Sequence, residues 1–284
     1  MTFVIRPAGP GDLEDVVALA RILNTLNLPN DRSTLKQLLN ASARSFAGQV
    51  RSKKNAVYVF ALEDSPACKV VGVSMIFAQH GTARMPHLYL QIKAQQKQSK
   101  TLKLKVSHRM LELGWDKDGP TELGGLVLDP AYRGHPQKLG KQLFMARLKY
   151  IVEHPQRFKK RLLVELLPPF RANGSSPFWD EWGGRFIPLT YPEADRLSRT
   201  NKEFILALFP RNGMYLNLFS TETQAVIGQA GGGSLASEKY LKEVGFKFLD
   251  QVDVFDGGPH YGARVEEIQK KVRTFQFSCS LNNQ

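Results

Sequence analysis

The first part of the chain shows apolar patterns typical of one strand and two helices. Residues 3–6 are predicted to form a short strand. In residues 12–23 the apolar side chains recur every three or four positions, as a helix with one buried face requires. They are Leu13, Val16, Val17, Leu19, Ala20 and Leu23. A second helix is predicted over residues 33–46, with Asp31 or Ser33 as its N-cap.

Extended segments follow the two helices. Residues 56–62 and 69–78 predict two strands, and the linking sequence EDSPAC is typical of a turn, so we expect a hairpin. Residues 81–120 indicate two further extended segments around a basic, glutamine-rich tip at 93–105. Since no aromatic residues are interleaved with the lysines of the tip, a solvated hairpin face is favoured over a surface that stacks RNA bases.

The central pattern is a strand, a tight basic loop and a helix over residues 126–150. Leu126, Val127 and Leu128 form an apolar run, which Asp129 and Pro130 end. A helix is expected from near Lys138, followed by a strand at 161–166 and therefore by a strand-helix-strand crossover. Unpaired N–H groups and the dipole at a helix N-terminus favour a bound anion.

Two interpretations of this loop are open from its own residues. Arg133, Lys138 and Lys141 add positive charge to a potential phosphate site. The same residues also suit an ordinary strand-helix connection with solvated lysines. The rest of the chain has to decide between them.

The remaining sequence completes an α/β pattern. Residues 168–233 are irregular, with helices expected around 191–199 and 203–208. A later helix is capped by Ser234 or Ser237 and ends at Gly245, and residues 246–255 alternate as a strand before a glycine turn. We therefore predict a three-layer α/β/α fold with a mixed sheet. Residues 1–284 are expected to form one domain, and residues 168–233 a block inserted between the fifth strand and the last helix.

Composition narrows the possible partners and location. The 284 residues are 42% hydrophobic, which suits a globular protein. The net charge of +13 favours anionic partners such as nucleic acid or a phosphate-bearing cofactor. Cys68 and Cys279 are too far apart in sequence to suggest a disulfide framework or a zinc site. We therefore expect no bound metal. Because the sequence has no apolar signal core and no long apolar run, we expect a soluble, cytoplasmic protein that does not bind a membrane.

The chain resembles the N-acyltransferases related to Gcn5. LDPAYRGHPQKLGKQLF is similar to the strand, pyrophosphate loop and helix of that superfamily, and YLKEVGF is similar to its closing helix and strand. Within the inserted block and around it, GSSPFW, VIGQ, VDVFDGGP and TELGGLVLDP resemble the arginine N-succinyltransferase family. This resemblance runs from about residue 5 to residue 262. Where related acyltransferases usually have two glycines in the loop, Lys138 takes the first place and Gly140 the second.

The resemblance implies an activity. The family moves a succinyl group from succinyl-coenzyme A to the α-amine of arginine, so we expect this chain to transfer a succinyl or related acyl group, with acetyl-coenzyme A as another candidate donor. The acceptor is expected to be arginine or a related amino acid. The expected coenzyme-binding residues are Leu126, Val127, Leu128, Arg133, Gly134, Lys138, Leu139, Gly140 and Lys141. Gly124 and Gly125 are expected to form a bulge that makes room for the pantetheine arm.

Amide formation from a thioester needs a proton acceptor for the amine and a proton donor for the thiolate. Glu122 and Glu165, on adjacent strands, are the candidate acceptors, with Glu122 preferred because TELGGLVLDP matches the family. Tyr240 is the candidate donor, although a tyrosine at this helical position also suits core packing. Of the six scattered histidines, only His135 lies in a segment with expected chemistry, and an exposed loop residue is the favoured interpretation for it.

The acceptor pocket is expected around the inserted block. Ser175, Ser176 and Asp256 are the candidate contacts, although Asp256 also suits a turn before two glycines. Phe178 and Trp179 are expected to be structural. The alternative function is a non-catalytic binding module or subunit of the same fold, whose basic face binds nucleic acid or a partner chain. A homo-oligomer or hetero-oligomer is possible on the family pattern.

Overall fold

The computed structural model describes residues 3–23 and 28–282. The strands are β1 (Phe3–Pro7), β2 (Val57–Asp64), β3 (Lys69–Phe77), β4 (His87–Ser99), β5 (Leu104–Asp116), β6 (Thr121–Leu128), β7 (Arg161–Glu165), β8 (Met214–Tyr215), β9 (Lys247–Val252), β10 (Pro259–Arg264) and β11 (Ser280–Leu281). The helices are α1 (Leu13–Leu23), α2 (Arg32–Phe46), α3 (Leu139–Glu153), α4 (Pro177–Glu181), α5 (Gly183–Phe186), α6 (Tyr191–Ser198), α7 (Glu203–Leu208), α8 (Thr221–Val226), α9 (Leu235–Val244) and α10 (Val265–Arg273).

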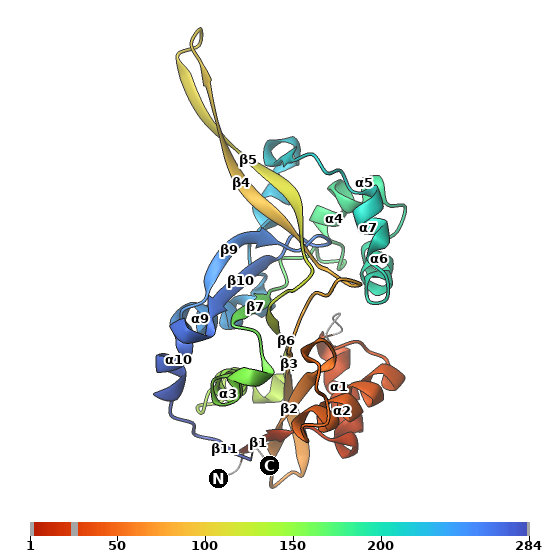
Figure 1. Ribbon diagram of the computed structural model, residues 1–284, viewed down its shortest axis with the longest axis vertical. Coiled ribbons are helices and arrows are strands. Elements are labelled where there is room, and N and C mark those ends of the chain that lie inside the picture. Colours follow the sequence, from red (N-terminus) through yellow and green to blue (C-terminus); the bar gives the residue numbers. More distant parts are fainter. Residues whose placement is uncertain (1–2, 24–27, 283–284) are drawn as a thin grey trace.

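All of these strands belong to one mixed sheet. Its order is β11-β1-β2-β3-β6-β7-β10-β9-β4-β5-β8. The strands pair antiparallel except for β1 with β11 and β6 with β7, and α3 is the crossover between the parallel strands β6 and β7. Helices α1 and α2 cover one face, and α3, α9 and α10 cover the other (Figure 1). The predicted three-layer α/β/α arrangement around a mixed sheet is therefore confirmed.

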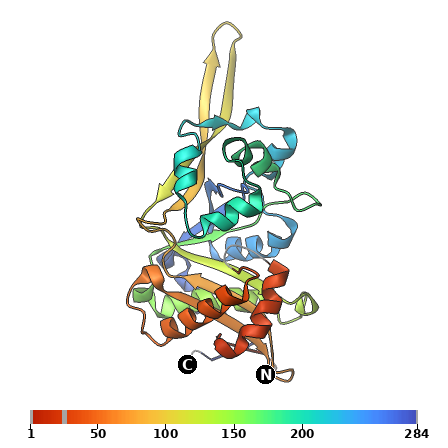
Figure 2. The same cartoon turned by 90° about the vertical axis from the view of Figure 1, so that its right-hand side faces the viewer.

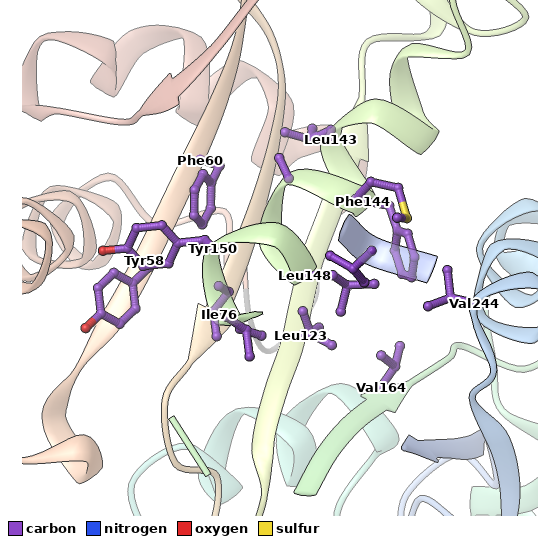
Figure 3. Packing of buried hydrophobic residues seen from close by; sticks show 14 of the residues in the cluster. Tyr58, Phe60, Ile76, Leu123, Leu143, Phe144, Leu148, Tyr150, Val164 and Val244 are labelled. Atoms are coloured by element: carbon purple, nitrogen blue, oxygen red, sulfur yellow. The ribbon is translucent and has the colours of Figure 1, made fainter. Parts of the chain in front are cut away.

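Two hydrophobic clusters fill the space between the sheet and its helices. On the α3 side, the labelled side chains in Figure 3 come from strands and helices that are far apart in sequence: Tyr58, Phe60, Ile76, Leu123, Leu143, Phe144, Leu148, Tyr150, Val164 and Val244. On the opposite face, Val16, Leu35 and Leu39 pack against Val59 and Met75. Since both faces of the central strands are buried, helix α3 and the loop before it are held firmly against β6.

The inserted block forms a third cluster away from these helices. Helices α4 to α7 pack beside the base of the long β4–β5 hairpin, which extends from the body as an arm (Figures 1 and 2). Phe178, Trp179 and Trp182 are buried there, so the predicted structural role of Phe178 and Trp179 is confirmed. The assignment of residues 168–233 as an insertion within a single domain stays a prediction.

Most expected elements are present, and the differences lie where packing overrides the local pattern. Asp31 caps α2 by accepting a hydrogen bond from the Thr34 N–H at 2.7 Å, which decides between the two candidate caps. The expected strand at 246–255 ends at Val252. After the glycine turn, the chain forms two elements that were not predicted from the sequence, β10 and α10, and Ile268 and Val272 of α10 are buried. Among the described residues, no helix is both long and apolar enough to cross a membrane.

Substitution of Leu148 tests the packing of α3. The Leu148 side chain is fully buried between α3 and the sheet. We expect Leu148→Ala to lower the free energy of unfolding by about 2–5 kcal/mol, because the lost methyl groups leave a cavity. Urea unfolding followed by circular dichroism measures this change. Leu218→Ala is the matched control, since Leu218 is 75% exposed, and an equal loss in both variants would contradict the packing described here.

Candidate functional site

The parallel strands β6 and β7 pair over a short stretch and then separate. Their register joins Thr121 to Leu162 and Glu122 to Leu163, and no later residue of β6 pairs with β7 in the described chain. Directly after this point, the register of β6 against β3 shifts by one residue between the pairs Met75–Gly124 and Val73–Val127. The bulge therefore follows Gly124 and includes Gly125, which has φ at +55°. The predicted bulge is confirmed. It leaves an opening between the strands immediately ahead of the loop to α3.

Arg147 lies fully buried next to the bulge. Its Nη1 donates to the carbonyl oxygens of Gly124 at 3.1 Å and Met75 at 3.4 Å, and its guanidinium lies over the Phe144 ring. Burial lowers the pKa of Arg147 to about 9, so the side chain still carries its charge at neutral pH. Arg147 therefore fixes the carbonyl groups on both sides of the bulge. Sequence reasoning missed it, although a lone arginine within the apolar helical run LFMARL was a visible signal.

The loop between β6 and α3 has the geometry of a helix N-terminal anion site. Pro130–Tyr132 form a 3-10 turn, Gly134 has φ at +74°, and Lys138 precedes the first residue of α3. Lys138 adopts the left-handed conformation, with φ at 52° and ψ at 51°. Glycine adopts this conformation without steric cost, whereas other residues lose roughly 1–2 kcal/mol. Lys138 thus keeps the backbone path that a glycine would favour, and its side chain is exposed.

The other predicted coenzyme-binding residues surround this helix start. Leu139 is buried in the core, and a side chain added at Gly140 would meet open space. Lys141 forms an ion pair with Glu243 at 2.6 Å and lies 5.8 Å from the centre of the Tyr240 ring. The Tyr240 ring is also 6.1 Å from that of Phe144. Tyr240 is thus placed against the first turns of α3, next to the loop.

Glu122 and Glu165 meet at the start of the opening, where His80 bridges them. The Glu122 side chain is 2% exposed, and its Oε2 lies 2.6 Å from His80 Nδ1. His80 Nε2 lies 4.0 Å from Glu165 Oε1. Loss of solvent around its carboxyl group, and after it the charge of Glu122, raise the pKa of Glu165 well above the usual range. The structure therefore brings together the two carboxylates that the sequence singled out.

Two more histidines complete this group, which we call the histidine cluster: His80, His87, His260, Glu122 and Glu165. His260 is opposite Glu165 in the β10–β7 register, and its Nε2 lies 3.7 Å from Glu165 Oε1. His87 Nδ1 lies 3.5 Å from the same oxygen. Burial, and after it the nearby His80, lower the pKa of His260 to about 3, and that of His87 falls for the same reasons. Both imidazoles are neutral at physiological pH.

The sequence interpretation of the histidines was wrong on this point. Only His135 had been placed near the chemistry, because the six histidines are scattered along the chain. Pairing of β7 with β10, together with the turn from Thr82 to Met85 in the connection between β3 and β4, brings His80, His87 and His260 together. His135 packs instead against the Phe3 ring at 5.1 Å. No spacing in the sequence signals this convergence.

The three predicted acceptor contacts lie in or beside the inserted block. Ser176 is buried, and its hydroxyl accepts a hydrogen bond from the Trp179 N–H as the cap of α4. The Ser175 hydroxyl donates to the side-chain oxygen of Asn173 at 2.8 Å. Asp256 accepts from the Gly258 N–H at 2.8 Å, as a turn residue would, and also lies 3.3 Å from the Tyr191 hydroxyl.

Further acidic groups surround Asp256. Burial, and after it the neighbouring Asp253, raise the pKa of Asp256 well above its usual range. The pKa of Asp195 is raised to about 6 by burial and by Asp253. A cationic ligand among these carboxylates would stabilise their charged forms.

A pocket of about 340 Å³ opens next to the histidine cluster. His87 lies in its wall together with side chains of β7, β9 and β10, including Leu163, Lys247 and Gln251. The pocket thus connects the cluster to the surface through His87.

Comparisons with known proteins agree with this geometry. A family model described as "Arginine N-succinyltransferase beta subunit" matches residues 3–270. The chain belongs to this family. It is 32% identical over 268 residues to the arginine N-succinyltransferase of Yersinia enterocolitica, covering 93% of this chain and 76% of that protein. A second relative, from Enterobacter sp., is 32% identical over 271 residues, with 94% and 77% covered.

A solved structure shows the same fold. The arginine/ornithine succinyltransferase subunit AI from Pseudomonas aeruginosa superposes with a TM-score of 0.82 at 28% identity, covering 96% of this chain and 79% of that one. Membership of the arginine N-succinyltransferase family confirms the resemblance identified from the sequence motifs and shows that the chain is an acyltransferase. The alternative of a non-catalytic binding module finds no support among these relatives.

Substitution of Arg147 tests its role at the bulge. In Arg147→Met the carbonyl groups of Gly124 and Met75 lose their buried donor, so we expect the free energy of unfolding to fall by about 1–3 kcal/mol. Chemical denaturation measures the change, and Arg109→Met on the exposed hairpin is the matched control. An Arg147→Met protein as stable as the unsubstituted chain would show that the guanidinium does not hold the bulge.

Proposed function

We propose that this acyltransferase moves a succinyl group from succinyl-coenzyme A to the α-amine of arginine or a related amino acid. The observation that carries the proposal is the opening between β6 and β7 directly ahead of the N-terminus of α3, in a chain that matches the arginine N-succinyltransferase family over residues 3–270. The opening suits a thioester arm, and the helix start suits a pyrophosphate. Carboxylates beside the opening suit a cationic acceptor.

Each part of the coenzyme has proposed partners in this arrangement. The pyrophosphate binds at Arg133, Gly134 and the start of α3, where Lys138, Leu139, Gly140 and Lys141 contribute backbone N–H groups and positive charge. The pantetheine arm follows Leu126, Val127 and Leu128 into the opening. Backbone N–H groups of this strand donate to the thioester carbonyl oxygen, where negative charge develops during attack. The supporting observations are the bulge at Gly125 and the left-handed Lys138.

The proposed chemistry is direct attack of the amine on the thioester. The α-amine loses a proton to Glu122 or Glu165, its nitrogen bonds to the carbonyl carbon, and the carbon–sulfur bond breaks. Tyr240 then gives a proton to the departing thiolate. The contacts of Tyr240 with α3 support its place along the coenzyme path, and the paired positions of Glu122 and Glu165 support theirs at the amine. Asp256, Ser175 and Ser176 are the proposed contacts for the rest of the acceptor.

Two finer expectations stay predictions of the sequence. One is a cytoplasmic location, and the other is assembly with a second copy or a related chain.

An acceptor panel tests the proposed activity. We expect thiol release from succinyl-coenzyme A when arginine is added, and slower release from acetyl-coenzyme A, because the family transfers succinyl groups. Ornithine and lysine serve as related cationic acceptors, and glutamate is an anionic control that the carboxylates around Asp256 should repel. Release with none of the cationic amino acids would overturn the proposed acceptor class.

Substitution of Tyr240 tests the proposed proton donor. We expect Tyr240→Phe to reduce kcat by about 100-fold or more, since general acid catalysis contributes this much, while the Kd for coenzyme A stays the same. Steady-state thiol release and calorimetric binding measure the two quantities. Tyr215→Phe, on the distant strand β8, is the matched control. Unchanged kcat in Tyr240→Phe would remove this residue from the mechanism.

A further inference from the structure

In the histidine cluster, one nitrogen from each of three imidazoles faces the same carboxylate oxygen, but all three nitrogen–oxygen distances are too long for hydrogen bonds. Glu165 Oε1 lies 3.5 Å from His87 Nδ1, 3.7 Å from His260 Nε2 and 4.0 Å from His80 Nε2. Protein hydrogen bonds to nitrogen are about 2.7–3.2 Å long. The three nitrogens therefore gather around the oxygen without bonding to it.

His260 makes this arrangement costly without a ligand. Its side chain has no exposed surface, and neither Nδ1 nor Nε2 has a hydrogen-bond partner among the described residues. A buried polar group that makes no hydrogen bond lowers stability by about 1–3 kcal/mol. A group bound between His260 and Glu165 would remove this cost.

The distances from Glu165 Oε1 to the three imidazole nitrogens, 3.5–4.0 Å, are close to the ligand spacing of a tetrahedral metal site. Zinc binds imidazole nitrogen and carboxylate oxygen at about 2.0–2.2 Å, so neighbouring ligand atoms of a tetrahedral site lie about 3.4 Å apart. The atoms of His80, His87 and Glu165 all lie within 4.8 Å of one another. His260 belongs to a second such group, with Glu165 and Asp253. Both groups share Glu165.

Glu122 supplies the outer contact that metal-binding histidines usually have. Its Oε2 lies 2.6 Å from His80 Nδ1, which leaves His80 Nε2 directed at Glu165. A carboxylate bound to the second nitrogen of a histidine sets the ring orientation and makes the first nitrogen a better ligand. Burial also favours the neutral imidazole, which is the form that binds metals.

We propose that the histidine cluster binds one divalent first-row transition metal ion, with three imidazole ligands and Glu165. Imidazole with one carboxylate suits Zn²⁺ in a tetrahedral site, whereas Mg²⁺ and Ca²⁺ prefer all-oxygen ligands. The charges also balance, because the two positive charges of the ion meet the carboxylates of Glu165 and Glu122. The two cysteines did not suggest a metal site, and the proposed ligands are histidines and a carboxylate that only the fold brings together.

The proposed metal site lies beside the opening for the thioester, so a bound metal ion would affect acyl transfer. If Glu165 accepts the proton of the amine, as the proposed function requires, the metal and the acceptor compete for the same carboxylate oxygen. Bound zinc then slows acyl transfer without changing the binding of coenzyme A.

Cobalt titration of the metal-free chain tests the site directly, without substrates. Four-coordinate Co²⁺ has strong visible d–d bands, whereas Co²⁺ in water has weak ones, so we expect strong bands that saturate at one ion per chain and disappear when Zn²⁺ is added. Mg²⁺ at the same concentration should not displace Co²⁺. Weak bands throughout the titration, or saturation at no defined ratio, would overturn the proposal.

Variants assign the ligands. We expect His260→Ala and His87→Ala to lose the strong bands, and Glu122→Gln to bind about 10–100-fold more weakly, as loss of an outer contact does. His108→Ala, on the β4–β5 arm, is the matched control and should bind as the unsubstituted chain does. Glu165→Gln nearly preserves side-chain volume and removes the anionic ligand, so it answers the question if a histidine variant fails to fold. Full binding by a folded Glu165→Gln or His260→Ala protein would overturn the assignment.

The rate of thiol release tests the effect of bound zinc on acyl transfer. We expect thiol release with arginine to be slower in the zinc-loaded chain than in the metal-free chain. Equal rates would overturn the competition for Glu165. Absence of release in both forms would overturn the proposed function, while the cobalt bands would still decide the metal site.

Discussion

The separation of β6 from β7 is the constraint on which the rest of this structure depends. Two parallel strands that part within a sheet leave backbone groups without their usual partners, and such groups lower stability unless something binds them. Arg147 donates to the carbonyl oxygen of Gly124 on β6, next to this separation, and to that of Met75 on β3. The coenzyme arm is the proposed partner of the backbone groups at the separation. A buried guanidinium is thus retained where an apolar side chain would pack more easily.

Buried charge gathers at the same place. Glu122, Glu165, Asp253 and Asp256 all lie near the ends of β6, β7 and β9, and burial raises the pKa of Glu165, Asp253 and Asp256. Groups of like charge with little solvent are unfavourable unless a cation joins them. A cationic amino acid and a divalent ion both meet that need. The arrangement therefore favours a positively charged ligand at this site, although the net charge of the chain is +13.

The loop before α3 shows how far a local pattern can be trusted. Its place, its basic residues and the helix after it follow from the sequence, because strand, turn and helix signals act over a few residues. The left-handed conformation of Lys138 does not, since a lysine favours other backbone angles on its own. Packing of Leu139 and α3 against the core compensates for that cost. The C-terminal helix α10 was not predicted. Most of its residues are charged, and only Ile268 and Val272 are buried, so its apolar pattern is weak.

The sequence by itself determined the order of the main elements, the mixed α/β class and the strand-loop-helix unit of β6 and α3, and it singled out Glu122 and Glu165. Periodicity, turn residues and motifs are local properties, so these features could be identified without coordinates. Only the tertiary structure decided that His80, His87 and His260 meet around Glu165, and that Arg147 holds the bulge. Strand pairing joins residues that are tens to hundreds of positions apart, such as Glu165 and His260. No local pattern records that register, because it follows from how the whole sheet packs.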